Sequence, residues 1–414
     1  VPDPDYVLTL DADSVLLPEY CLRLVHLMEQ PGQERTAVAQ TPYSAYPGST
    51  TRIERLAGAT TDLQHIVHQG LTHYNATFWV GANAVLRKAA LDDIVEVDDR
   101  GAHPVRRFIQ DRTVIEDTES SVDLGARGWK LVNYPERLSY SATPPDFGSL
   151  SIQRQRWANG GLLIMSKLWR SLRRRRHQGE RMGMGEAFLR VNYMASICWA
   201  SFGLAVLLIY PYTNRLLSPL VLVTALPYFL AMAADLARCG YRRLDVLRIY
   251  GFNLVLLPVN LSGVMKSIGQ ALTGRKIPFA RTPKIRNRTT AQLTFVLTPY
   301  LLVAWSGFTF VGDIQATRWA HAAFAGANAL LATYAIVAYI GIRHSVEDVW
   351  MNLVSRLYRP EPALAPAATA SMDELDWESV LYLGDTGTAS SVLSTVRSGN
   401  GRPKTERPRK GALS

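Results

Sequence analysis

The chain has 414 residues, 48% of them hydrophobic, and its mean hydropathy is close to zero, which is high for a wholly soluble protein and predicts contact with a lipid bilayer. Its formal net charge is +10, but the basic residues cluster beside apolar runs and form no stripe interleaved with aromatic residues, so nucleic acid is not expected as a partner. The 3 cysteines have no metal-ligand spacing, which argues against a disulfide framework and a zinc site.

Residues 1 to about 160 alternate short strand-like runs with helix-like segments. The strand-like runs are YVLTL, TAVAQTP, FWVGANAVL and KLVNYP, and the helix-like segments are EYCLRLVHLMEQ and RIERLAGATTDLQHIVHQGL. This alternation predicts an α/β domain with a mainly parallel sheet. The chain opens without methionine, on a short loop that leads into an expected buried strand, so we expect it to be a fragment of a longer protein.

Four later apolar runs are long enough to cross a bilayer core, which takes about 20 residues. They lie at 188–212, 217–235, 292–311 and 319–342. A fifth run at 246–272 has arginine and lysine residues on both flanks. Because an excess of these residues marks cytoplasmic loops, we expect the fifth run to form an interfacial or re-entrant helix. This gives a membrane domain over 188–342 with four crossings.

Two further segments flank the membrane domain. The stretch 161–187 is strongly basic and is expected to form an interfacial linker. Residues 343–414 are rich in Ala, Ser, Thr and Gly in their greater part and are expected to form a mostly disordered cytoplasmic tail. The front domain is then cytoplasmic as well.

Two acids, Asp11 and Asp13, follow directly on the first apolar run. Most such D-x-D pairs are solvated loop acids or caps. This pair, however, follows a predicted strand, at the edge where open α/β sheets bind ligands. Two carboxylates at such an edge can hold a hard divalent cation, and the cation can neutralise a nucleotide diphosphate.

A second acidic pair, Glu116 and Asp117, precedes a helix-like stretch. Acids in the first turn of a helix suit its dipole, so a plain capping role is the simpler interpretation. The functional interpretation makes Asp117 a general base that deprotonates an acceptor hydroxyl.

The stretch QRQRW contains Gln153, Arg156 and Trp157. An amphipathic helix near the membrane, with Trp157 as interfacial anchor, would explain it. A functional interpretation uses each residue: Arg156 pairs with a leaving diphosphate, Trp157 offers a flat face to a sugar, and Gln153 hydrogen-bonds either one.

The order of the three motifs, followed by membrane spans, resembles the processive family-2 glycosyltransferases of the cellulose-synthase type. The resemblance covers residues 1 to about 342. FWVGANAVLRKAAL is similar to the glycine-containing segment of that family, and FARTPK at 279–284 is similar to its gating-loop motif F-x-V-T-x-K. In the family this motif follows an interfacial helix, which agrees with the placement of 246–272.

The resemblance implies a GT-A-like (Rossmann-like) α/β domain over 1–160, followed by an all-α multi-span membrane domain. Asp11 and Asp13 would bind the nucleotide sugar and its Mg²⁺ or Mn²⁺, with Asp13 as the direct ligand. Asp117 would be the catalytic base with Glu116 beside it.

The same resemblance assigns the later motifs. Gln153 and Arg156 would border the diphosphate, and Trp157 would stack on the acceptor sugar. A gating-like loop over 275–288 would close on the donor through three of its residues, namely Phe279, Thr282 and Lys284.

The chain departs from the family pattern in three places. Ile115 stands where the family has the threonine of T-E-D, and Arg281 stands where the gating motif has valine. The family's first nucleotide-binding strands and N-terminal spans are missing, so the chain is expected to be N-terminally truncated and not to bind donor normally as it stands.

The expected function is that of an inverting membrane glycosyltransferase. It would transfer glucose from UDP-glucose to a growing β-linked polysaccharide and translocate the product, with N-acetylglucosamine and mannose left open as sugars. A non-processive lipid glycosyltransferase and a catalytically silent membrane scaffold are the alternatives. The plasma (inner) membrane is the expected location, and accessory export subunits are expected partners.

Overall fold

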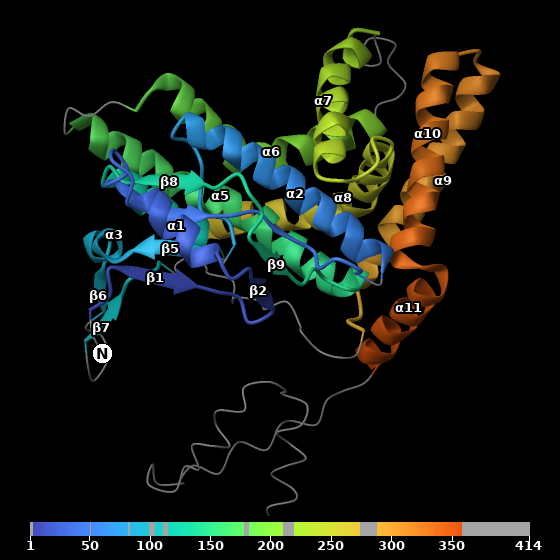
Figure 1. The fold of residues 1–414 in the computed structure, drawn as a ribbon. Coiled ribbons are helices and arrows are strands. Elements are labelled where there is room, and N and C mark those ends of the chain that lie inside the picture. Colours follow the sequence, from blue (N-terminus) through green and yellow to red (C-terminus); the bar gives the residue numbers. More distant parts are fainter. Residues whose placement is uncertain are drawn as a thin grey trace, which may run out of the picture. The chain divides into compact units, whose positions relative to one another are not determined.

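The computed structural model describes residues 3–49, 51–81, 83–98, 104–110, 115–177, 182–209, 219–273 and 288–357. Residues 1–284 and 288–354 form one compact unit, drawn in Figure 1. Within this unit, a sheet with flanking helices is followed by long helices.

The central sheet has the strand order β1 (Tyr6–Thr9), β5 (Ala84–Arg87), β3 (Thr36–Gln40) and β8 (Lys130–Asn133). The four strand-like runs of the sequence each contribute one of these strands. β3 and β8 are parallel, whereas β5 is antiparallel to both β1 and β3. The expectation of a mainly parallel sheet was therefore wrong for the described strands: the sheet is mixed because β5 runs in the opposite direction between two strands.

β1 was expected to be a buried strand, and it is only half-buried. It lies at the edge of the described sheet and pairs with β5 alone. Leu8 is consequently 40% exposed. The carboxyl end of β1 leads directly into the D-x-D motif.

Helices cover both faces of the central sheet. α1 (Tyr20–Met28) packs on Val85 of β5, while α3 (Lys88–Asp93) and α4 (Glu116–Ala126) pack on Ala84 and Leu86. Val85 and its neighbours Ala84 and Leu86 face opposite sides of the sheet because side chains alternate along a strand. α2 (Arg52–His73), the second expected helix, begins at a capping box formed by Thr51 and Glu54.

Two smaller sheets complete the α/β part. β2 (Ser14–Leu16), β9 (Ser139–Ser141) and β4 (Tyr43–Ser44) pair in that order, and β6 (Glu96–Asp98) pairs with β7 (Val105–Arg107). β9 joins β2, which follows the D-x-D motif, to β4.

The remaining elements are helical. They are α5 (Phe147–His177), α6 (Met184–Ile209), α7 (Pro219–Arg238), α8 (Asp245–Thr273), α9 (Leu293–Gln315), α10 (Trp319–Ala335), the π-helix η1 (Ile336–Ile340) and α11 (Ile342–Leu357). The division expected at residue 160 falls inside α5, so the first half of the expected basic linker is helical. The expected tail likewise begins with helix α11, and its residues from 358 onward lie outside the described part.

Four described helices are long and apolar enough to cross a membrane: Met184–Leu208, Asp245–Thr273, Leu293–Gln315 and Trp319–Ile340. Three of them match expected spans. The expected span at 217–235 falls on α7, whose first side chains lie outside the described residues.

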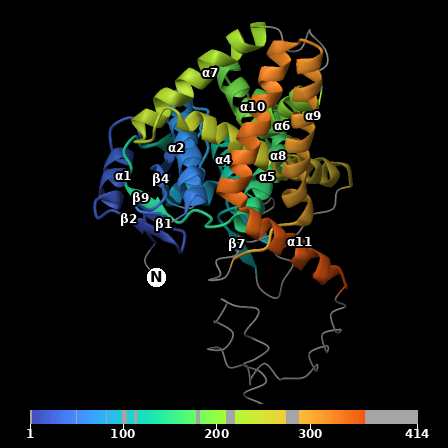
Figure 2. The ribbon, with the colours of Figure 1, turned by 90° about the vertical axis from the view of Figure 1, so that its right-hand side faces the viewer.

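The other helix in this set is α8, which was expected to be interfacial. Half of its apolar window is buried in the protein, and it packs on α5, α6, α9 and α10. Figures 1 and 2 show α8 running across the axes of α9 and α10. Its non-crossing placement stays a prediction.

Candidate active site

The D-x-D motif forms a turn between β1 and β2. The N–H of Ser14 donates to the carbonyl of Asp11 at 3.0 Å, which closes the turn. The buried side chain of Asn83 holds it from the start of β5: its Oδ1 accepts from the Asp11 N–H at 3.2 Å, and its Nδ2 donates to Ser14 Oγ at 3.0 Å. Asp11 is exposed, whereas Asp13 is half-buried and its Oδ1 is buried, so the turn presents the Asp11 carboxylate on the protein surface.

Glu116 and Asp117 form the first turn of α4, as the capping interpretation requires. Asp117 also has a second, long-range contact, because its Oδ2 accepts from the N–H of Gly81 at 2.7 Å. Its Oδ1 accepts from the N–H of Thr118 at 2.6 Å. Ile115, which precedes the pair, packs so closely on α5 that a Cβ on Gly160 would lie 2.4 Å from its Cγ1. Ile115 thus fixes the acids against the motif helix.

The surroundings of Asp117 tune its acidity. Burial raises the pKa of Asp117 to about 6, and the nearby charge of Glu116 adds to the increase. The hydrogen bonds from Gly81 and Thr118 and the charge of Arg156 act in the opposite direction. A carboxylate with a pKa near 6 is ionised at neutral pH and is a better proton acceptor than an ordinary aspartate, as a general base requires.

Tyr43 lies at the centre of the candidate site. Gly81 has a φ of 90°, and a Cβ added to it would meet Cε1 of Tyr43 at 2.6 Å, so the tyrosine ring packs directly on this glycine. Burial raises the pKa of Tyr43, the charges of Asp117 and Asp11 raise it further, and those of Arg154 and Arg156 lower it. The hydroxyl therefore stays protonated, within electrostatic range of residues from all three motifs.

The QRQRW motif lies in the first half of α5. Gln153, Arg156 and Trp157 are spaced i, i+3 and i+4, so they share one helix face. The charge of Arg156 lowers the pKa of both Asp117 and Tyr43. Gln153 is half-buried, and no hydrogen bond of its side chain is seen within the described part of the chain.

Trp157 has a neighbour that the sequence did not indicate. The guanidinium of Arg154 lies 4.6 Å from the centroid of the Trp157 ring, and its Nη2 donates to Thr60 Oγ1 of α2 at 2.6 Å. The Arg154 guanidinium therefore covers one face of the indole, so a sugar could stack only on the other face.

Helix α5, which carries the QRQRW motif, also forms hydrogen bonds with α8 and with the segment after the expected gating-like loop. Gln155 donates to Ser262 Oγ at 2.8 Å and accepts from Lys266 at 2.7 Å. Asp146 caps α5 by accepting from the Ser149 N–H at 2.8 Å, and its other carboxylate oxygen accepts from the Thr289 N–H at 3.2 Å. The loop residues themselves, namely Phe279, Thr282 and Lys284, lie outside the described residues.

The residues of the site limit how a divalent cation could be bound. Within the described ranges, no group of three or more His, Cys, Asp and Glu side chains could enclose a metal ion. Asp11 and Asp13 alone supply hard oxygen ligands at an accessible turn. Mg²⁺ is commonly held by one or two carboxylates together with substrate phosphates. The donor set fits a cation of that kind, completed by a nucleotide diphosphate.

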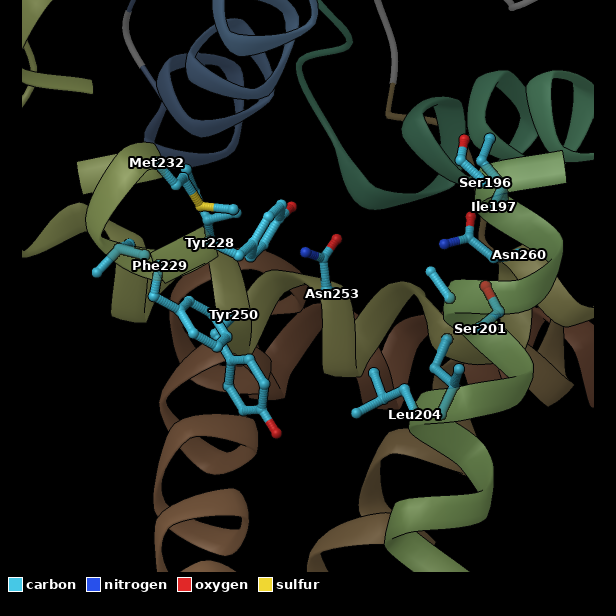
Figure 3. Close-up of a pocket in the computed structure, with 14 residues that line it drawn as sticks. Ser196, Ile197, Ser201, Leu204, Tyr228, Phe229, Met232, Tyr250, Asn253 and Asn260 are labelled. Atoms are coloured by element: carbon cyan, nitrogen blue, oxygen red, sulfur yellow. The ribbon is translucent and has the colours of Figure 1, made fainter. Parts of the chain in front are cut away.

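A cavity of about 390 Å³ lies among α6, α7 and α8. Figure 3 shows Ser196 and Ser201 of α6 across from Tyr228, Phe229 and Met232 of α7, with Asn253 of α8 between them. None of the lining residues is charged; they are Ser196, Ile197, Ala200, Ser201, Leu204, Tyr228, Phe229, Met232, Val246, Ile249, Tyr250, Asn253, Leu257 and Asn260.

Gly81 and Asn83 bring the two acidic motifs together, because the Gly81 N–H donates to Asp117 and Asn83 accepts from the Asp11 N–H. Arg156 acts on Asp117 by its charge. Four residues around the site were not predicted as site residues: Tyr43, Gly81, Asn83 and Arg154. Gly81 and Asn83 lie in the glycine-containing segment and Arg154 lies within QRQRW, which were usable signals, while Tyr43 has none in one sequence.

The profile described as "Glycosyl transferase family group 2" matches residues 6–233. A UDP-forming cellulose synthase catalytic subunit of Dictyostelium discoideum is 28% identical over 167 residues, which are 40% of this chain and 14% of that protein. A protein of Oryza sativa subsp. japonica named "Probable glucomannan 4-beta-mannosyltransferase 9" is 25% identical over 169 residues, 41% of this chain and 30% of its own length.

These matches cover less than a third of either relative's length. Among solved structures, a mannosyltransferase from Pyrobaculum calidifontis in complex with GDP-Man and Mn²⁺ has a TM-score of 0.33 and 14% identity, covering 66% of this chain and 63% of that one. The family profile spans more than half of the chain and both groups of acids. The chain therefore belongs to glycosyl transferase family group 2, and its α/β domain has a mixed sheet with flanking helices.

Proposed function

We propose that the protein is an inverting, membrane-bound glycosyltransferase that transfers glucose from UDP-glucose to a growing β-linked polysaccharide. One observation carries this proposal: Gly81 and Asn83 contact both acidic motifs, since the Gly81 N–H donates to Asp117 and Asn83 Oδ1 accepts from the Asp11 N–H. The charge of Arg156 also acts on Asp117. A helix cap would need only Asp117, and a membrane anchor would need only Trp157, so neither interpretation accounts for these contacts.

The residues suggest a separate role in the reaction for each charged group. Asp117 accepts the proton of an acceptor hydroxyl, whose oxygen attacks the anomeric carbon of the donor. The bond from that carbon to the diphosphate breaks on the opposite face, so the configuration inverts and the electron pair leaves with the diphosphate. Arg156, with Gln153 beside it, neutralises the departing charge.

Asp11 and Asp13 would hold Mg²⁺ or Mn²⁺ against the donor diphosphate, and the cation would supply further charge neutralisation. Trp157 would receive the acceptor sugar on the ring face that Arg154 leaves open. Glu116, by its charge, makes Asp117 a stronger base. Phe279, Thr282 and Lys284 would close over the donor, and the tie between Thr289 and Asp146 supports this role because it joins the end of that loop to the motif helix.

The uncharged cavity supports a path for the product. Asn260, which lines it, is two residues from Ser262, the partner of Gln155 in the motif helix. Aromatic rings, amides and hydroxyls suit a neutral, hydroxyl-rich chain. We place the α/β domain and the tail on the cytoplasmic side of the plasma membrane, because the basic residues flank the helices there. Accessory export subunits would receive the polysaccharide.

The test uses membranes that contain the full-length protein. They are incubated separately with radiolabelled UDP-glucose, UDP-N-acetylglucosamine and GDP-mannose, and the product is digested with linkage-specific hydrolases. We expect a glucose polymer, and Asp117→Asn should lose about 10²- to 10⁴-fold of the rate while it still binds donor. If the label extracts with lipid, the non-processive alternative is correct. If no label is incorporated from any of the three donors, the protein is a silent scaffold.

A further inference from the structure

The second half of α5 has two contrasting faces. Ile164 and Leu168 are fully buried in a cluster with Met194 of α6, and Leu172 packs against the same cluster. The opposite face exposes Trp169, Arg170, Arg173 and Arg174. We call these four residues the α5 basic surface.

The α5 basic surface has an excess of positive charge. Nearby acids are already paired, because Glu119 and Asp123 both contact Lys167 and Glu186 contacts Arg190. No ion pair to Arg170, Arg173 or Arg174 is seen in the described ranges of the chain. Three guanidiniums on one helix face, without carboxylate partners there, form a binding surface for anions.

The surface also carries an amphipathic aromatic residue. Trp169 is 57% exposed, and the guanidinium of Arg173 lies 5.4 Å from its ring centroid. An exposed tryptophan beside arginines is the combination found where proteins meet lipid headgroups, since the ring tolerates the boundary between water and hydrocarbon.

The position of the surface in the chain indicates which anions it meets. α6, against which this part of α5 packs, is long and apolar enough to span a membrane from Met184 onward. Its first turns expose Met184 and Phe188, the latter at 69%. Arg190 and Tyr193, farther along α6, pack on Phe78 of the α/β domain, so the α5 basic surface lies on the α/β-domain side of the apolar part of α6. Basic residues on that side of a spanning helix can attract the anionic headgroups of the membrane surface.

We propose that the α5 basic surface binds anionic phospholipid headgroups, and that these lipids are selected over zwitterionic ones. This inference does not depend on which sugar the protein transfers. A basic side chain near an anionic membrane surface contributes attraction equivalent to about fivefold in affinity, so three of them should enrich anionic lipid about tenfold or more after screening by salt.

Trp169 itself can report the bound lipid. The full-length protein is reconstituted in phosphatidylcholine vesicles with equal fractions of either brominated phosphatidylglycerol or brominated phosphatidylcholine, whose bromine atoms quench tryptophan on contact. The chain has 9 tryptophans, so the Trp169→Phe variant is measured in parallel and subtracted. We expect stronger quenching of the Trp169 emission by the brominated anionic lipid, and we expect added salt to reduce the difference.

Three variants separate charge from fold. R170Q/R173Q/R174Q should abolish the preference, R170K/R173K/R174K should keep most of it, and R52Q/R55Q/R127Q, which removes three exposed charges of the α/β domain, should leave it unchanged. Equal quenching by both brominated lipids, or a preference that survives R170Q/R173Q/R174Q, would overturn the proposal. So would binding of a short RNA that this variant abolishes while no lipid preference is seen.

Discussion

The backbone N–H of Gly81 donates a 2.7 Å hydrogen bond to Oδ2 of Asp117, across 36 residues of sequence. The bond joins the glycine-containing segment to the acidic motif and stabilises the ionised carboxylate, while burial and Glu116 oppose ionisation. The reactivity of Asp117 therefore depends on a balance that single substitutions can shift in either direction.

The first prediction concerns pH. With its pKa raised to about 6, Asp117 should give an acid limb in kcat/KM near that pH, with activity rising as the carboxylate ionises. Glu116→Gln removes a negative neighbour, which favours ionised Asp117 and should shift the limb to lower pH. Asp92→Asn on α3 serves as the control. An acid limb that stays in place in Glu116→Gln would show that Asp117 is not the titrating base.

The second prediction concerns Gly81 and Tyr43. Gly81→Ala should lower kcat at least tenfold, because the added Cβ would meet Tyr43 at 2.6 Å and displace the N–H that contacts Asp117. Gly32 is the matched control: its φ of 87° imposes similar backbone strain on alanine, but nothing lies within 4 Å of the added Cβ. Both variants should lose thermal stability from backbone strain, and Gly81→Ala should lose more because of its clash with Tyr43. Equal kcat in the two variants would argue against a role for this contact.

The third prediction distinguishes a sugar platform from a membrane anchor at Trp157. A platform needs a broad ring face, so both Trp157→Tyr and Trp157→Leu should reduce polymer yield per inserted protein, with a larger loss for leucine. Arg156→Lys should weaken binding of the nucleotide diphosphate, because lysine cannot form the bidentate pair. If Trp157→Leu makes polymer at the wild-type rate after normalisation for insertion, the residue is an anchor.

The fourth prediction concerns the placement of α8. Single cysteines replacing the exposed Arg243 and Thr290, in a background where Cys21, Cys198 and Cys239 are serine, flank this helix. Both should be protected from an impermeant thiol reagent added outside intact cells, because basic residues surround both ends. Lysis should make both reactive. Labelling of one position alone in intact cells would show that α8 crosses the membrane.

Local sequence patterns were sufficient to predict the four strands of the central sheet and the helices α1, α2 and α4, but not the short strands β2, β4, β6, β7 and β9 or helix α3. β3 and β8 are short apolar runs, and α2 has both its helical period and its capping box in the sequence. The direction of β5 could not be predicted in this way, because a run such as AVLR is equally apolar in either direction. Strand direction depends on the path of the connecting segments, which residue patterns do not encode.

The two acidic pairs could be singled out because Asp11 and Asp13 follow a recognisable strand, and Glu116 and Asp117 begin a recognisable helix. The contacts of Tyr43 could not, since they depend on the approach of Gly81 and α5 from distant parts of the chain. The continuation of α5 beyond residue 160 was also missed. Its second half is rich in arginine and has only a narrow buried stripe at Ile164 and Leu168, which a composition-based interpretation treats as a linker.

α5 runs without a proline from Phe147 to His177 and carries the reaction motif in one half and exposed arginines in the other. At a rise of about 1.5 Å per residue, Arg156 and Arg173 are separated by about 25 Å along the same rod. Gly160 and Gly161, the pair at which such a helix could bend, are held in close contact with Ile115 and Met194. A rotation of the arginine-bearing half would therefore also turn Gln153, Arg156 and Trp157.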